Sequence, residues 1–167
     1  MPHVRTRLLL VAATVVSGVL AGGIVDRMIV GGPAWHELGS DTWVQYSRLA
    51  DLGTGLVAFP IEGIGSALLI IAAAVSNYFD RNAPLAVSLP LYLAVALSII
   101  GLLLTAKAAP IMLGLAEPQS AAAIQHAFED FFFWGLYLRG LADMLAFVVL
   151  VVALANFAWP KSELNRA

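Results

Sequence analysis

The chain of 167 residues is 60% hydrophobic and only 12% charged, and its formal net charge is −2. Soluble domains carry about 25% charged residues, so this composition argues against a water-soluble protein. The absence of cysteine excludes disulfides, thiolate metal sites and thiol catalysis. The slightly negative charge, with no basic stripe for phosphate, excludes nucleic acid as a partner.

Four apolar segments are each long enough to cross a bilayer as a helix, which takes about 20 mostly apolar residues. They lie at roughly 8–31, 54–78, 87–109 and 130–158. In hydrocarbon the backbone must satisfy its own hydrogen bonds, so these segments are expected to be helices. The sequence therefore predicts an all-α fold, a single domain over residues 1–167 that forms an integral membrane four-helix bundle in a lipid bilayer.

The connections between the apolar segments predict further helices outside the bilayer. Residues 32–53 mix turn residues with aromatic and charged side chains, which favours short surface helices. The sequence from about Ser120 has helical character, so the fourth membrane helix is expected to begin before its apolar segment.

Basic residues near the segment ends indicate an orientation. They are Arg5, Arg7, Arg81, Lys161 and Arg166. Because basic residues favour the cytoplasmic side, we expect both termini in the cytoplasm, in a membrane of the bacterial inner-membrane type. Arg5 and Arg7 before an apolar run also resemble a secretory signal, although the run continues to Val30, beyond the usual length of a signal core.

Ionisable residues gather in the outer half of all four segments. With a rise of about 1.5 Å per residue, Glu62 and Asp143 lie roughly 22 Å from the cytoplasmic ends of their helices. The same count places Asp26 and Arg27 at roughly 27 Å, and Lys107 and Arg139 near 30 Å. Charges in hydrocarbon normally face the bundle interior. We therefore expect an outward-facing polar chamber, closed on the cytoplasmic side by Leu, Ile, Val and Ala.

The fourth segment carries Arg139 and Asp143 four residues apart, so the two side chains share a helix face and are expected to pair. Helical phase predicts one interior stripe, formed by Glu129, Phe132, Leu136, Arg139, Asp143 and Phe147. Two interpretations stay open. The pair locks the fourth helix to its neighbours, or it belongs to a substrate or proton site.

Glu62 is the acid that we expect to be functional, in preference to Asp143. It follows Pro60, which removes a backbone hydrogen bond, and it precedes Gly63, which allows a neighbouring helix to approach. Asp143 has an arginine one turn away, whereas no basic residue lies one turn from Glu62. The alternative is that Glu62 forms a salt bridge with Arg27, Lys107 or Arg139.

Metal and nucleophile chemistry have weak support. His36, His126, Glu129 and Glu62 are a conceivable set of nitrogen and oxygen ligands, and two histidines of the outer connections are a conceivable pair for haem. Di-iron bundles repeat a Glu-x-x-His motif, whereas this chain has one reversed copy, His126-x-x-Glu129. Ser17 and Ser66 have no His or Asp in their sequence neighbourhood, so no hydrolase triad is expected. We expect neither a metal nor another cofactor.

Four stretches resemble a known family. They are VSGVLAGGIVDRMIV in the first segment, TWVQYSRLADLG in the following connection, PIMLGL after the third segment, and the Trp134-x-x-x-x-Arg139 spacing. In this order they resemble the small four-span membrane proteins named after fungal anthrone oxygenases. The resemblance covers roughly residues 8–158.

The resemblance implies oxidation of an activated polyphenolic carbon by dioxygen, without a bound cofactor. It would assign Glu62 or Asp143 as the base. Arg139, Lys107 or Arg27 would stabilise the resulting anion. Phe132, Trp134 and Tyr137 would contact a flat aromatic substrate.

Two other classes of function stay open. The first is a non-enzymatic accessory or scaffold subunit, because small-residue faces such as SGVLAGG suit the docking of neighbouring membrane subunits. Such a subunit would fill its chamber with salt bridges, whereas an enzyme would keep a cavity of substrate size. The second is a proton or ion carrier, against which the uncharged cytoplasmic half argues.

Overall fold

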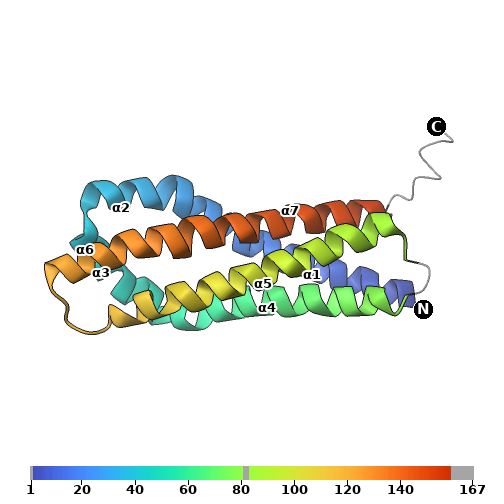
Figure 1. Cartoon of the computed structure of the whole chain (residues 1–167), viewed down its shortest axis with the longest axis horizontal. Coiled ribbons are helices and arrows are strands. Elements are labelled where there is room, and N and C mark those ends of the chain that lie inside the picture. The colour runs from blue at the N-terminus through green and yellow to red at the C-terminus, as the bar shows by residue number, and fades with distance from the viewer. Residues whose placement is uncertain (1, 81–82, 159–167) are drawn as a thin grey trace.

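The computed structural model describes residues 2–80 and 83–158, and over these ranges the chain is helical with no strand (Figure 1). In chain order the elements are α1 (Pro2–Asp26), η1 (Arg27–Gly31), α2 (Gly32–Leu38), α3 (Ser40–Leu49), η2 (Ala50–Thr54), α4 (Gly55–Tyr78), α5 (Leu85–Gly114), α6 (Ala121–Asp130), η3 (Phe131–Leu138) and α7 (Arg139–Ala158). The three η elements are π-helices, in which each turn is wider than in an α-helix. The prediction of an all-α fold is therefore confirmed.

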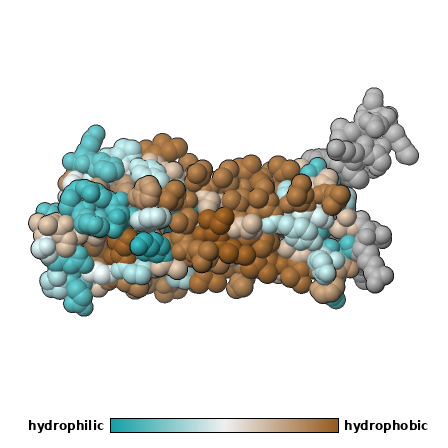
Figure 2. Space-filling view, viewed as in Figure 1, coloured by the Kyte–Doolittle hydropathy of each residue, from teal (hydrophilic) through white to brown (hydrophobic). Residues whose placement is uncertain are grey.

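Within the part of the chain that the structure describes, four helical units are long and apolar enough to span a membrane. They are Val4–Leu38, Ser40–Tyr78, Leu85–Gly114 and Ala121–Phe157. Each overlaps one of the four predicted apolar segments and begins before it, and the fourth ends one residue short of the predicted end at 158. On the face shown in Figure 2, hydrophobic side chains form a band across the middle of the molecule, with hydrophilic side chains towards both ends.

The two ends of the bundle differ. At one, which we call the terminal end, α1 begins, α4 ends, α5 begins and α7 ends (Figure 1). The other, the loop end, carries α2, α3 and α6. The predicted short helices of residues 32–53 are thus present, and α6 continues through η3 into α7 as expected. Gly39 makes the corner between α2 and α3 with a φ of 86°, a backbone conformation that favours glycine.

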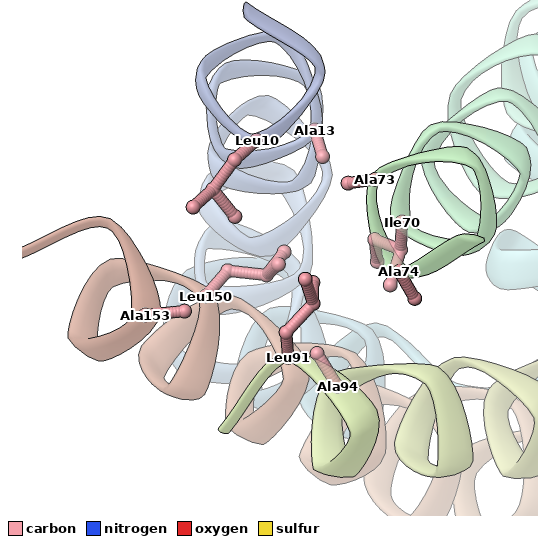
Figure 3. Packing of buried hydrophobic residues seen from close by; sticks show 9 residues of the cluster. All are labelled: Leu10, Ala13, Ile70, Ala73, Ala74, Leu91, Ala94, Leu150 and Ala153. Atoms are coloured by element: carbon pink, nitrogen blue, oxygen red, sulfur yellow. The ribbon is translucent and has the colours of Figure 1, made fainter. Parts of the chain in front are cut away.

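The terminal half of the bundle has an apolar core, to which all four long helices contribute (Figure 3). It consists of Leu10, Ala13, Ile70, Ala73, Ala74, Leu91, Ala94, Leu150 and Ala153. The alanines let the helices approach closely, and the larger side chains fill the space between them. This packing matches the apolar closure that we expected on this side of the chamber.

The loop half has a second, aromatic core under α2, α3 and α6. It consists of Trp35, Trp43, Val44, Leu115, Phe128, Phe131, Phe132 and Leu136. We call α2, α3 and α6 together the cap. Arg48 of α3 connects the cap to the residues that follow α5, because its Nε donates to the Leu115 carbonyl at 2.6 Å and its Nη2 donates to the Glu117 carbonyl at 3.1 Å. The cap therefore packs directly on the long helices and covers the loop half of the bundle.

Candidate functional site

A cavity of about 250 Å³ lies in the loop half of the bundle, between α1, α4, α5, η2 and η3, and we call it the loop-end cavity. Most of its wall is apolar, with Leu20, Ile24, Phe59, Leu102, Met112 and Phe131 among its lining residues. Five polar or charged side chains also line it, namely Arg27, Asp51, Glu62, Thr105 and Arg139. A largely apolar pocket with a few convergent polar groups is the usual form of a small-molecule site.

Arg27 and Asp51 form an ion pair at the wall of this cavity. Arg27 Nη2 donates to Asp51 Oδ1 at 2.6 Å, and the guanidinium carbon lies 4.5 Å from the centroid of the Phe59 ring. Asp51 is only 4% exposed. Its second oxygen, Oδ2, is buried and has no hydrogen-bond partner among the described residues. The pair connects η1 to η2 and leaves one carboxylate oxygen unused.

Sequence reasoning did not identify Asp51, because it lies in a connection that was expected to be on the surface. One signal was present. Trp43, Ser47 and Asp51 are spaced at i, i+4 and i+8, and all three are buried on one face of α3 and η2. An aspartate that continues the buried face of a helix is a candidate for a functional acid, because such a charge needs a specific partner.

Arg139 and Asp143 form the pair that their spacing predicts, with Arg139 Nε 3.4 Å from Asp143 Oδ2. Arg139 also reaches α4, since a Cβ added to Gly63 would lie 3.9 Å from its Nη2. Asp143 faces α5, where a Cβ added to Gly101 would lie 2.5 Å from its Oδ1. The glycine at position 101 therefore lets α5 accept the carboxylate.

Beneath the loop-end cavity lies a small polar cavity of about 20 Å³, which is large enough for about one water molecule. Its polar lining consists of Ser17, Ser66, Ser98, Thr105, Arg139 and Asp143. Ser17 Oγ and Ser66 Oγ are 2.7 Å apart and bond to each other across α1 and α4. Asp143 lines the same cavity as these serines, although it is distant from both in sequence. No histidine lines this cavity, so a Ser-His-Asp arrangement is not formed there.

Glu62 lines the loop-end cavity and is half-buried. The expected alternative, a salt bridge from Glu62 to an arginine or lysine, is not formed, since within the described ranges Glu62 has no ion pair or hydrogen bond. Arg27 binds Asp51 and Arg139 binds Asp143. The carboxylate of Glu62 is thus left available to a molecule in the cavity.

The predicted aromatic and lysine contacts are placed differently from the expectation. Lys107 is exposed, its Nζ lies 5.8 Å from the Trp134 ring centroid, and neither residue belongs to the cavity lining. Tyr137 is 40% exposed and also lies outside the lining. Phe132 is 3% exposed and packs in the aromatic core of the loop half. None of these four residues lines the cavity.

The π-helical turns of η3 explain why the predicted stripe is partly wrong. The stripe assumed α-helical spacing, yet residues 131–138 are π-helical, so the phase changes across this segment. Glu129 at the start of the predicted stripe is exposed, and Phe131 and Gly135, which lie outside the stripe, line the cavity. Phe132 and Leu136 of the stripe are buried, as expected. Arg139 still reaches the interior because the α-helix resumes there.

The conceivable metal ligands lie apart from one another. The His36 ring packs against Phe132 at a centroid distance of 4.6 Å. His126 Nδ1 lies 3.2 Å from Asp130 Oδ2, and Glu129 Oε1 accepts a hydrogen bond of 2.7 Å from Gln125 Nε2. Among the residues described, no three His, Asp or Glu side chains come close enough to hold a metal ion.

All three π-helices adjoin the loop-end cavity. Arg27 begins η1, Asp51 lies in η2, and η3 supplies lining residues directly before Arg139. Short π-helical turns inside longer helices occur frequently at functional sites. The irregular turns, the ion pairs and the cavity therefore coincide in one region. No protein-family model, curated protein or solved structure matches the chain.

Proposed function

We propose that this chain is an integral membrane protein that binds a small hydrophobic aromatic molecule in the loop-end cavity and oxidises it. The observation that carries the binding half is the cavity itself, about 250 Å³ with an apolar wall and charged groups at defined positions. This volume lies slightly below the usual range of drug-sized ligand pockets, which begins at about 300 Å³. A flat ligand of two or three fused rings suits a site of this size.

The oxidation half rests on the resemblance to anthrone oxygenases and on which charges are free. Glu62 would take a proton from an activated ring carbon, and the arginines of the cavity would stabilise the enolate oxygen. The carbanion would add dioxygen, and loss of water from the peroxide would leave a carbonyl. In this sequence CH₂ and O₂ become C=O and H₂O, so no external reductant is needed.

The accessory-subunit alternative is less well supported. A scaffold has no reason to keep an open volume in its interior, since unfilled space forfeits packing energy. The two ion pairs at this cavity, Arg27–Asp51 and Arg139–Asp143, leave it open. The open volume therefore favours a small molecule as the partner.

Filling the cavity tests the binding proposal. Gly23 lines the cavity and a Cβ added to it would meet nothing within 4 Å, so Gly23→Leu is expected to fit the fold and occupy the ligand space. Gly22 also has free space around an added Cβ but is not a lining residue, so Gly22→Leu is the matched control. The measurement is equilibrium dialysis of labelled naphthalene against protein in nanodiscs, with empty nanodiscs subtracted.

We expect Gly23→Leu to weaken naphthalene binding about tenfold or more and Gly22→Leu to bind as the wild type does. Specific binding that survives equally in both variants would place the ligand elsewhere. A wild-type protein with no specific binding would contradict the proposed function.

Glu62→Gln tests the catalytic half. The substitution keeps the shape and removes the charge, so the variant is expected to fold and to lose oxygen consumption with anthrone by about 10²-fold or more, the usual contribution of a general base. Asp143→Asn is instead expected to reduce stability, because it leaves Arg139 without its partner. Full activity in Glu62→Gln, measured with an oxygen electrode, would remove Glu62 from the mechanism.

A further inference from the structure

We infer that the ligand of the loop-end cavity enters sideways from the bilayer, through an opening between α4 and α5, and is therefore a neutral molecule that dissolves in lipid. The inference rests on the proposed function, because it assumes that the cavity holds a small aromatic molecule within a membrane. It adds the route and the source of that molecule, which the cavity volume alone does not give.

One face of α4 changes from buried to exposed where it reaches the cavity. Leu56, Ala67 and Ala74 follow one another at intervals of about three and two turns, so they lie on nearly the same side of the helix. This side adjoins α5, because Ala74 lines a groove together with Tyr92 and Val95 of α5. Ala67 is 3% exposed and Ala74 is 6% exposed, whereas Leu56 is 49% exposed and lines the cavity. The cover that α5 gives to this face is therefore lost at the cavity.

Other lining residues on both helices mark the same opening. Pro60 and Ile64 of α4 line the cavity and are exposed. Leu102 and Ala109 of α5 line it and are partly exposed. Val95, Leu102 and Ala109 recur at intervals of about two turns, so they share the side of α5 that adjoins α4. The cavity thus has an exposed wall along the boundary between α4 and α5.

Each helix beside the opening contains a proline, Pro60 in α4 and Pro110 in α5. A proline inside a helix removes one backbone hydrogen bond, and its ring presses on the preceding turn, so the helix bends. The two helices share the apolar core of the terminal half, where Ala74 and Leu91 are buried. Bending at the prolines gives a physical reason why they separate in the loop half.

The loop end offers no comparable entrance. Among the described residues, α2, α3 and α6 contribute none to the cavity lining. Phe131 and Leu136 belong both to the cavity wall and to the aromatic core, in which Trp43 is fully buried. A molecule that came from water on this side would have to pass through packed aromatic rings.

The boundary between α1 and α4 is crossed by polar contacts. Gly23 is an exposed lining residue there. One turn further, Arg27 binds Asp51 at 2.6 Å, and its guanidinium carbon lies 4.5 Å from the Phe59 ring centroid. Entry at this boundary would disturb an ion pair, whereas entry between α4 and α5 displaces only lipid.

The surface around the opening is apolar. Val57, Ile61 and Leu103 lie beside the lining residues in sequence and are exposed. A surface of this kind suits lipid and is unfavourable in water. A charged molecule would have to lose its hydration to cross such a surface, which is costly. The route therefore selects neutral molecules that already reside in the membrane.

A reversible block of the opening tests the route. The chain has no cysteine, so a single introduced thiol can be tagged specifically. Ile64→Cys places the thiol at the opening, and Ile61→Cys is the matched control, because Ile61 is exposed on the same helix but does not line the cavity. Each variant is tagged in detergent with benzyl methanethiosulfonate, checked by mass spectrometry and placed in nanodiscs. Exchange of 1-fluoronaphthalene between lipid and site is then measured by ¹⁹F NMR.

We expect the tag on Ile64→Cys to slow dissociation of the probe about tenfold or more, because an obstructed route raises the barrier in both directions. The fraction of probe bound at equilibrium should change little. The tag on Ile61→Cys should leave the rate as in the wild type. Reduction of the disulfide should restore the rate of Ile64→Cys, which separates obstruction from damage to the fold within one preparation.

Failure of the route and failure of the proposed function give different results. Absence of specific binding by the wild type contradicts both. A dissociation rate that the tag leaves unchanged, or slows equally in both variants, overturns the lateral route and leaves the site standing. A tag that lowers the bound fraction without slowing dissociation does the same, because Ile64 is then only a wall of the site. Leu56→Cys with Val57→Cys as its control repeats the comparison if Ile64→Cys does not fold.

Discussion

The position of the Asp143 carboxylate depends on Gly101 of α5, which has no side chain. The carboxylate lies so close to α5 that a Cβ at position 101 would be 2.5 Å from its Oδ1. Thr105, one turn further along α5, turns its hydroxyl back to the Gly101 carbonyl at 2.8 Å. Glycine therefore provides the space for the carboxylate, and the small polar cavity beside it depends on this close approach.

Gly101→Ala is expected to destabilise the protein by about 1–3 kcal/mol, the usual cost of overpacking a filled interior. The added methyl group would force Asp143 away from α5 and disturb its contact with Arg139. The measurement is thermal unfolding in detergent. Gly22→Ala is the control, since an added Cβ there meets nothing within 4 Å and alanine favours the helix. Equal stability of the two variants would show that Asp143 has another position available.

At this scale the sequence predicted some contacts and missed others for a clear reason. The pairing of Arg139 with Asp143 follows from local spacing, because both residues lie on one helix. The pairing of Arg27 with Asp51 joins two elements whose relative placement no local pattern gives. Glu62 is likewise left without an ion-pair partner because Arg27 pairs with Asp51 and Arg139 pairs with Asp143.

A backbone hydrogen bond that is missing within α5 is replaced by a side chain of α7. Pro90 lies inside α5 and has no N–H, so the carbonyl of Ala86, four residues earlier, loses its regular partner. Asn156 of α7 supplies the replacement, with its Nδ2 donating to the Ala86 carbonyl at 2.9 Å. The proline thus creates a hydrogen bond between helices in place of one within a helix.

A double-mutant cycle tests this exchange. Asn156→Ala is expected to destabilise the protein by about 1 kcal/mol, the usual net value of one hydrogen bond. In a Pro90→Ala background the same substitution is expected to cost much less, because the N–H of residue 90 can then bond to the Ala86 carbonyl. The readout is the difference in unfolding free energy between the two backgrounds. Equal costs in both would mean that Asn156 acts independently of the proline.

The helical segments were predictable because a long apolar run has few alternatives in a membrane. The sequence did not predict which helical turns would be π-helical. No composition or spacing in residues 131–138 marks them as π-helical, since this choice depends on packing against α5 and the aromatic core. The stripe predicted for this helix therefore holds from Phe132 and Leu136 to Arg139 and Asp143, and fails at Glu129.

On the face shown in Figure 2, a hydrophobic band lies between two ends that carry hydrophilic side chains. At the terminal end Arg5 and Arg7 are exposed. At the loop end Glu37, Asp41 and Glu129 are exposed. Arg81, Lys161 and Arg166, which also entered the orientation argument, lie outside the described residues. Composition predicted the band, since apolar residues that face lipid need no partner, whereas the position of the cavity depends on how all the helices pack.

We expect both termini to be cytoplasmic, because basic residues near the ends of membrane helices are retained on that side. Reporter fusions at each terminus measure this directly. Fusions placed after Leu38 and after Glu117 are the complementary controls, since these positions lie at the loop end and should report the opposite side. A terminus found outside, or a loop-end fusion found in the cytoplasm, would contradict the orientation and with it the outward-facing cavity.

The π-helices have a consequence for how this chain tolerates changes in length. One residue turns an α-helix by about 100°, so a deletion within η3 that restores α-helical turns would rotate α7 relative to α6. Arg139 and Asp143 would then leave the interior, although no polar residue had been replaced. A related chain could therefore keep both charged residues and still lose the site, because the deletion of one residue in η3 would turn them away from the interior. Alignments that place gaps within residues 27–31, 50–54 or 131–138 would mark proteins with different chemistry.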